Sequence, residues 1–78
     1  MPSRPAQPMP EDVRLAIEKR GVQADYDARP WYQRNDYLAW IARAKRADTR
    51  ARRLAQMLDE LEQGGVYMRM IHAPSHKQ

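Results

Sequence analysis

The sequence contains no cysteine and no phenylalanine, and only 3 of its 78 residues are glycine. Without cysteine the chain forms no disulfide and offers no thiolate to a metal ion. Without phenylalanine, its large apolar side chains come from two tryptophans, four tyrosines and the aliphatic residues. A chain of this length forms one small domain, which has little volume to enclose a deep substrate pocket. We therefore expect a protein that is not an enzyme and needs no cofactor.

Several other features are missing as well. No apolar stretch approaches the roughly 18 residues of a membrane span, and the first residues lack the apolar run of a secretory signal, so we expect a cytoplasmic protein. There is no glycine-rich phosphate loop and no Ser/His/Asp order, so no catalytic residue is predicted. His72 and His76 have helical metal-ligand spacing, but Pro74 between them disfavours a helix, and no metal site is predicted.

The chain predicts an all-α fold: a compact three-helix domain over residues 10–65 with a disordered leader and an irregular tail. The leader, residues 1–9, is rich in proline, which has no N–H for helix or sheet bonding. A first helix over residues 10–20 begins at Pro10 with two carboxylates in its first turn and stops at Gly21. Residues 21–29 are expected to form a loop.

The second and third predicted helices carry the clearest apolar periodicity. The second begins at Pro30 and ends near Lys45 or Arg46. The third begins with Asp48 as its N-cap, carries an apolar stripe from Ala51 to Leu61, and ends at two glycines. The tail covers residues 66–78, and its segment 66–71 either docks on the helices or extends alone.

The positive charge of the chain is concentrated in residues 43–53, here called the basic segment. The net charge is +4, yet this segment holds six cationic side chains against Asp48 alone. Such a patch attracts anions over roughly 8–10 Å at physiological salt. We predict a binding surface for an anionic partner, which could be a protein, a lipid head group or nucleic acid; a protein is favoured, and nucleic acid is the main alternative. Its residues are Arg43, Lys45, Arg46, Arg52 and Arg53.

Two further interpretations compete for this surface. Thr49, Arg52 and Gln56 share the outward side of the third helix, so a helix-turn-helix unit could place that helix in a DNA groove or against RNA. Alternatively, the cationic side chains only solvate the helix and cover apolar packing with their stems. No dimerisation element supports the DNA interpretation.

Arg50 differs from its neighbours because it falls on the apolar side of the third helix, about 40° from Leu54 at 100° per residue. A guanidinium there needs a partner. This partner could be a carbonyl group at the end of the second helix, the carboxylate of Glu11 or Asp12, or a bound anion. A structural clamp is the favoured role.

The aromatic and acidic residues are expected to be structural. Trp31, Trp40 and Tyr37 are predicted to build the core in place of phenylalanine, while Tyr32 lies opposite the apolar face and is expected to be exposed. An aromatic surface for stacking bases or gripping a peptide is the alternative. Asp59, Glu60 and Glu62 are predicted to form a solvated acidic end of the third helix.

Part of this pattern resembles a known family. It is similar to the signature of the YdeI/OmpD-associated, or bacteriocin-protection, family. In that signature an aromatic residue with isoleucine is followed by an Ala-Lys step, an acidic step, a Thr-Arg step and a basic pair before an apolar helix. The elements here are Trp40-Ile41, Ala44-Lys45, Asp48, Thr49-Arg50 and Arg52-Arg53.

The resemblance covers about half of the chain, over residues 30–65. Family members often carry an additional β-rich domain, for which this chain is too short, and the entry Ala28-Arg29-Pro30-Trp31 departs from the expected small-residue-plus-proline step. The resemblance implies a helical binding module linked to the bacterial envelope or to resistance against cationic peptides. The identity of its partner, its oligomeric state and its physiological role are not encoded in these motifs.

Overall fold

The computed structural model describes residues 5–71, with side chains described through residue 69. This part contains four helices and one short antiparallel hairpin, so the all-α prediction is confirmed. The bounds are α1 Glu11–Arg20, α2 Gln23–Ala28, α3 Trp31–Ala42, α4 Ala47–Gln63, β1 Val66–Tyr67 and β2 Met70–Ile71.

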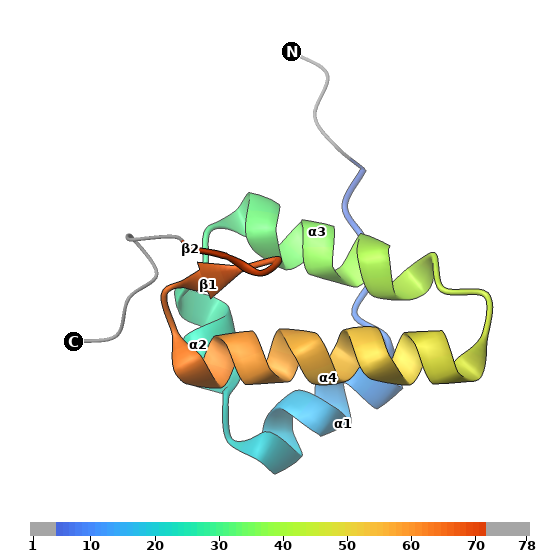
Figure 1. Ribbon diagram of the computed structural model, residues 1–78, viewed down its shortest axis with the longest axis horizontal. Helices are drawn as coiled ribbons and strands as arrows, with labels where there is room; N and C mark the ends of the chain where they lie inside the picture. The colour runs from blue at the N-terminus through green and yellow to red at the C-terminus, as the bar shows by residue number, and fades with distance from the viewer. Residues whose placement is uncertain (1–4, 72–78) are drawn as a thin grey trace.

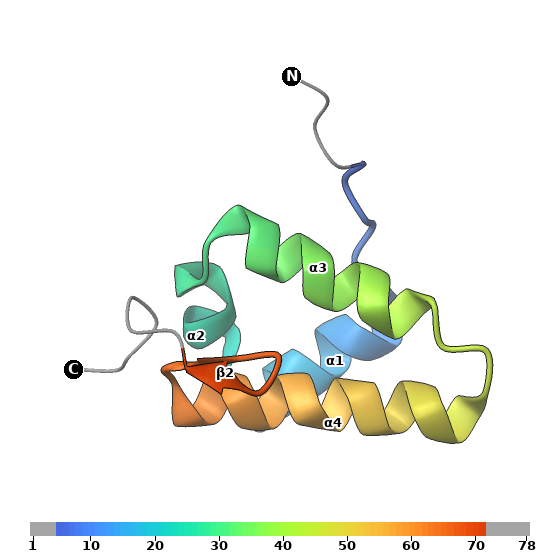
Figure 2. The same ribbon diagram turned by 45° about the horizontal axis from the view of Figure 1, so that its top comes forward.

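The longest helix, α4, is the centre of the arrangement. α3 runs beside it in the opposite direction, and α1 lies against another side of α4 (Figure 1). The hairpin folds back over the C-terminal part of α4, on the side where α2 and the start of α3 lie (Figure 2). Three segments that are distant in sequence therefore meet at one surface: α3, the middle of α4 and the hairpin.

The core is built by side chains that recur at helical spacing on α1, α3 and α4. Tyr37 is fully buried at its centre, and Trp40 packs against it from the edge. Trp31, which the sequence placed in the core, is instead 46% exposed, because it occupies the first turn of α3 ahead of the buried stripe. Tyr32 is 40% exposed, as expected. The buried apolar residues are Val13, Ile17, Val22, Tyr26, Tyr37, Leu38, Ile41, Met57, Leu58 and Leu61.

The helix ends follow the predicted signals in part. α1 ends at Arg20, and Gly21, with a left-handed backbone (φ 76°), caps it as predicted. α3 ends at Ala42, three or four residues earlier than predicted, because residues 43–46 form the turn that lets α4 run back along α3. For the same reason the N-cap of α4 is Arg46 and not Asp48. Asp48 lies within the first turn and accepts a hydrogen bond from its neighbour's backbone N–H.

The short helix α2 replaces the loop that was predicted over residues 21–29. Its six residues have too little length for periodicity to show, and an isolated helix of this size is unstable in water. Burial of Tyr26 and Val22 stabilises it, with the Tyr26 N–H donating to the Val22 carbonyl at 2.9 Å. Tertiary packing, rather than local propensity, forms this helix.

The two ends of the described chain are held against the helices. Asn35 accepts a hydrogen bond from the Gln7 N–H (2.7 Å) and donates one to the Pro5 carbonyl (3.0 Å). Part of the predicted leader is therefore attached to α3, while residues 1–4 lie outside the described residues. Of the predicted tail, residues 66–71 form the docked hairpin. His72 and His76 also lie outside the described residues.

Candidate functional site

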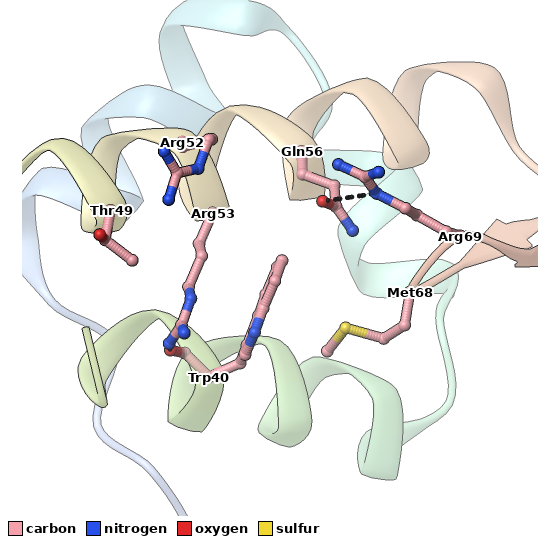
Figure 3. A pocket seen from close by; sticks show the side chains of 7 residues that line it. All are labelled: Trp40, Thr49, Arg52, Arg53, Gln56, Met68 and Arg69. Carbon is pink, nitrogen blue, oxygen red and sulfur yellow. Dashed lines mark hydrogen bonds between the residues drawn. The ribbon is translucent and has the colours of Figure 1, made fainter.

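A surface groove of about 460 Å³ lies where α3, α4 and the hairpin meet. Figure 3 shows its walls: Trp40 rises from α3, four side chains come from α4, and two come from the turn of the hairpin. Three arginines line it, and no carboxylate does. Its lining residues are Trp40, Thr49, Arg52, Arg53, Gln56, Met68 and Arg69.

The structure brings only part of the predicted basic surface to this groove. Arg52 and Arg53 line it, together with the neighbours on α4 that the sequence placed on the same side. Arg43, Lys45 and Arg46 are instead exposed at the α3–α4 turn and do not line the groove. Within the basic segment, the groove and the turn are therefore two separate surfaces.

Arg53 is a wall of the groove rather than a freely projecting charge. Its Nη1 donates to the Trp40 carbonyl at 2.7 Å, and its guanidinium lies 5.2 Å from the centre of the Trp40 ring. That carbonyl belongs to the last turn of α3, where carbonyl groups have no helical partner and the helix dipole favours a cation. Arg53 thus joins α4 to α3 and covers one face of the tryptophan.

Arg52 has a different environment. It is exposed, and its guanidinium makes no hydrogen bond or ion pair with any other residue that the structure describes. A guanidinium has five N–H donors in a fixed fork that matches a carboxylate or phosphate. Arg52 can therefore bind an incoming anion without first breaking a bond within the described part of the protein.

Arg50 lies away from the groove and joins α4 to two other helices. Both its Nε and Nη2 lie 3.1 Å from the Asp12 carboxylate, and its Nη1 lies 3.4 Å from the Ile41 carbonyl. These are two of the partner types named from the sequence. Hydrogen bonding to Arg50 lowers the pKa of Asp12 below its ordinary value of 3.8.

Arg69 is a groove residue that the sequence did not reveal, because it lies in the segment predicted as tail. It occupies the two-residue turn between β1 and β2, with Met68 before it. Its Nε donates to Gln56 at 3.1 Å, as the dashed line in Figure 3 shows. The Met68 side chain points from the same turn toward Trp40 (Figure 3). No motif marks either residue, and only the folded hairpin brings them to α4.

Glu60 holds this turn in place. One of its carboxylate oxygens accepts the Tyr37 hydroxyl and the Met68 N–H (2.8 Å), and the other accepts the Arg69 N–H (2.9 Å) and the Gln56 amide (3.1 Å). Glu60 is only 5% exposed, so its prediction as part of a solvated acidic end is wrong. Burial, together with the bond to Glu60, raises the pKa of Tyr37 above its ordinary value of 10.

The rest of the predicted acidic end does lie at the surface. Asp59 and Glu62 both pair with Arg20 of α1, at 2.5 and 2.8 Å. The buried Arg29 donates to the Glu60 carbonyl at 2.9 Å and so supplies the cation that the last turn of α4 lacks. The end of α4 is therefore fixed from three directions: by α1, by Arg29 and by the hairpin.

A second hollow adjoins the groove beyond the bond between Gln56 and Arg69. It has a volume of about 380 Å³, and its lining includes the carboxyl-bearing residues Asp59 and Glu60. This hollow also shares Arg52 and Arg69 with the groove, so its lining carries both signs of charge, whereas the only charged side chains that line the groove are arginines. No group of three or more histidine, aspartate or glutamate residues with the arrangement of a metal site occurs among residues 5–71.

These features define a small helical module with a basic groove beside a docked hairpin. Residues 7–64 match the sequence model of the OmdA family, described as bacteriocin-protection, YdeI or OmpD-associated, and the chain belongs to this family. No curated protein and no solved structure matches the chain significantly. In the described part of the chain, none of the helices combines the length and apolar character required to cross a membrane.

Proposed function

We propose that this family member is a non-enzymatic binding module that holds an anionic partner in the groove. The observation that carries the proposal is the lining itself, with three arginines and no carboxylate. Charges of one sign gathered in a concave surface raise the local concentration of the opposite ion. Arg52 supplies donors that no described residue uses, and Arg69 has donors beyond the one bonded to Gln56.

The charge of the groove also bears on the family's link to bacteriocin protection. A cationic peptide is repelled by the groove and by the net charge of +4, so direct capture of such a peptide is disfavoured. Binding of an anionic partner protein is the better-supported route by which this module would act.

Nucleic acid is less well supported as the partner. In a helix-turn-helix unit the two helices cross at roughly 90–120°. Here α3 and α4 lie alongside one another in opposite directions, and the hairpin covers part of α4 (Figures 1 and 2). A phosphate backbone that continued past Gln56 would also approach the Asp59 carboxylate, because Asp59 lines the adjoining hollow together with Arg52 and Arg69.

Fluorescence anisotropy with labelled hexaglutamate, hexalysine and mixed-sequence DNA tests the proposal. We expect hexaglutamate to bind with a salt-dependent affinity, hexalysine not to bind, and DNA to bind more weakly than hexaglutamate. Replacing Arg52 and Arg69 by glutamine should weaken binding at least tenfold. The matched control replaces Arg43 and Lys45 by glutamine, which removes the same charge outside the groove.

Each outcome of this experiment bears on a different part of the proposal. Equal losses in the two double variants would show that charge alone, and not the groove, holds the anion. Tighter binding of DNA than of hexaglutamate would favour the nucleic-acid alternative. Absence of binding to all anions would refute the proposed function.

A further inference from the structure

The turn of the hairpin has an unfavourable sequence for its backbone. Met68 (φ 51°) and Arg69 (φ 66°) both adopt left-handed conformations, and Tyr67 pairs with Met70 on either side of them. A two-residue turn with both φ angles positive strongly favours Asn-Gly, because other L-residues crowd their own backbone there. The chain therefore keeps two large side chains at positions where local stability favours small ones.

The surrounding structure keeps this turn in place. The buried Glu60 carboxylate accepts the backbone N–H groups of both turn residues, at 2.8 and 2.9 Å. Strained backbone that its surroundings hold in this way is concentrated at binding and catalytic sites. The two strained residues are also the two that the hairpin contributes to the groove. The strain therefore indicates that both side chains, the Met68 thioether and the Arg69 guanidinium, take part in binding.

The groove accordingly has two kinds of surface. Arg52 and Arg69 present guanidinium groups, while Trp40 and Met68 present apolar surface between α3 and α4 (Figure 3). A bare anion would contact only the guanidinium groups and leave the apolar surface unused. A stacked base would have only one face of Trp40 available, because Arg53 lies over the other, and it would leave the arginines without an anion unless its phosphate also reached them. A carboxylate followed by an apolar side chain uses both surfaces.

We propose that the groove binds a short acidic peptide segment in which a carboxylate adjoins an apolar side chain. The inference rests on the proposed function and specifies the partner. Arg52 and Arg69 bind the carboxylate, and the apolar side chain packs against Trp40 and Met68. The volume of about 460 Å³ falls within the range of about 300–1,000 Å³ typical of ligand sites and suits a few residues rather than a folded surface. The adjoining hollow shares Arg52 and Arg69 but adds Asp59 and Glu60, so the groove is the more favourable place for the carboxylate of the segment.

Heteronuclear NMR of the indole N–H groups tests this assignment and is suited to weak binding. Trp40 lines the groove, while the exposed Trp31 does not and serves as an internal control. The probes are three hexapeptides with a glycine and serine frame and a central Glu-Phe, Glu-Ser or Gln-Phe pair, together with inorganic phosphate and a mixed-sequence single-stranded oligonucleotide. We expect the Glu-Phe peptide to shift the Trp40 signal and to bind at least tenfold more tightly than the other probes.

Variants identify the contacts that produce the difference. Replacing Arg52 and Arg69 by glutamine should weaken binding of the Glu-Phe peptide at least tenfold, while replacing Arg43 and Lys45 should weaken it less than threefold. Met68→Ala should weaken binding of the Glu-Phe peptide and leave the Glu-Ser peptide unchanged. An unchanged signal of Trp31 in each variant shows that the fold is retained.

The possible results separate the inference from the function on which it rests. Equal affinity for the Glu-Phe and Glu-Ser peptides would overturn the apolar contact and leave anion binding in place. Tighter binding of the oligonucleotide would overturn the peptide assignment. If no probe shifts Trp40 at millimolar concentration, both the inference and the proposed function are refuted.

Discussion

Glu60 provides the sharpest test of how this small domain is stabilised. Its carboxylate lies at the junction of α3, α4 and the hairpin, and its two oxygens accept four hydrogen bonds. Two of the donors are backbone N–H groups, those of Met68 and Arg69, which cannot reverse their polarity. We expect Glu60→Gln to destabilise the protein, because its amide nitrogen must face one of these two donors in either orientation.

The magnitude follows from the number of bonds lost. A hydrogen bond to a charged group contributes about 1.5–3 kcal/mol, so the loss of one such bond in Glu60→Gln should cost about 2 kcal/mol. Glu60→Ala removes the acceptor of all four donors, and its cost should reach about 3–5 kcal/mol after water solvates the part-exposed ones. In a domain of this size 1 kcal/mol corresponds to about 4–8 °C, so Glu60→Gln should lower the Tm by about 8–16 °C.

Thermal and urea unfolding, followed by far-ultraviolet circular dichroism, measure both changes. Asp59→Asn is the matched control, because Asp59 is the preceding residue on α4 and its side chain is 67% exposed. Arg20 keeps its ion pair with Glu62 in this control, so the cost should stay below about 1 kcal/mol. A loss below about 0.5 kcal/mol in Glu60→Gln, or equal losses in the variant and the control, would refute the argument.

Three further predictions concern other contacts. Arg50→Ala should lower the Tm more than Arg52→Ala at neutral pH, because only Arg50 bonds to Asp12. Arg50 lowers the pKa of Asp12 below 3.8 in the folded protein, so this stabilisation is complete above pH 3.8 and is lost as the pH falls through the lower folded-state pKa. The difference in Tm between the two variants should therefore shrink in acid, and a difference that stayed constant with pH would contradict the ion pair. Arg69→Gly should be more stable than Arg69→Ala by about 0.5–1 kcal/mol in urea unfolding, since glycine relieves the left-handed strain, and equal stability would show that the turn is not strained. Asn35→Ala should accelerate hydrogen exchange at the Gln7 amide while the helices keep their protection, and unchanged exchange would show that Asn35 does not hold residues 5–9.

The sequence predicted those parts of the fold that local patterns encode. The apolar stripes and end signals of α1 and α4 placed these helices to within one or two residues. The helix α2 has no such pattern, since it consists of six residues that tertiary burial holds in place. The early end of α3 at Ala42 was missed as well, because the turn length is set by how α4 packs back along α3.

The candidate site was predicted only in the part that lies on one helix. Arg52, Arg53 and their neighbours on α4 share a face because of helical periodicity, which a sequence shows directly. Arg69 reaches the groove only through the docked hairpin, and the buried Glu60 carboxylate accepts two of its four hydrogen bonds from that hairpin. A contact between residues brought together by docking has no periodic signal, so these two residues could not be assigned from the sequence.

The arrangement around Glu60 has a consequence for how the groove can change during evolution. Glu60, which also accepts the Tyr37 hydroxyl, holds the hairpin wall through the backbone N–H groups of Met68 and Arg69, so these bonds do not depend on which side chains the two turn residues carry. On the α4 side, the groove is lined by the exposed Arg52 and the half-buried Thr49. Family members could therefore acquire new partners by substitutions at the lining side chains of α4 and of the turn, while Glu60 keeps the backbone of the hairpin in place.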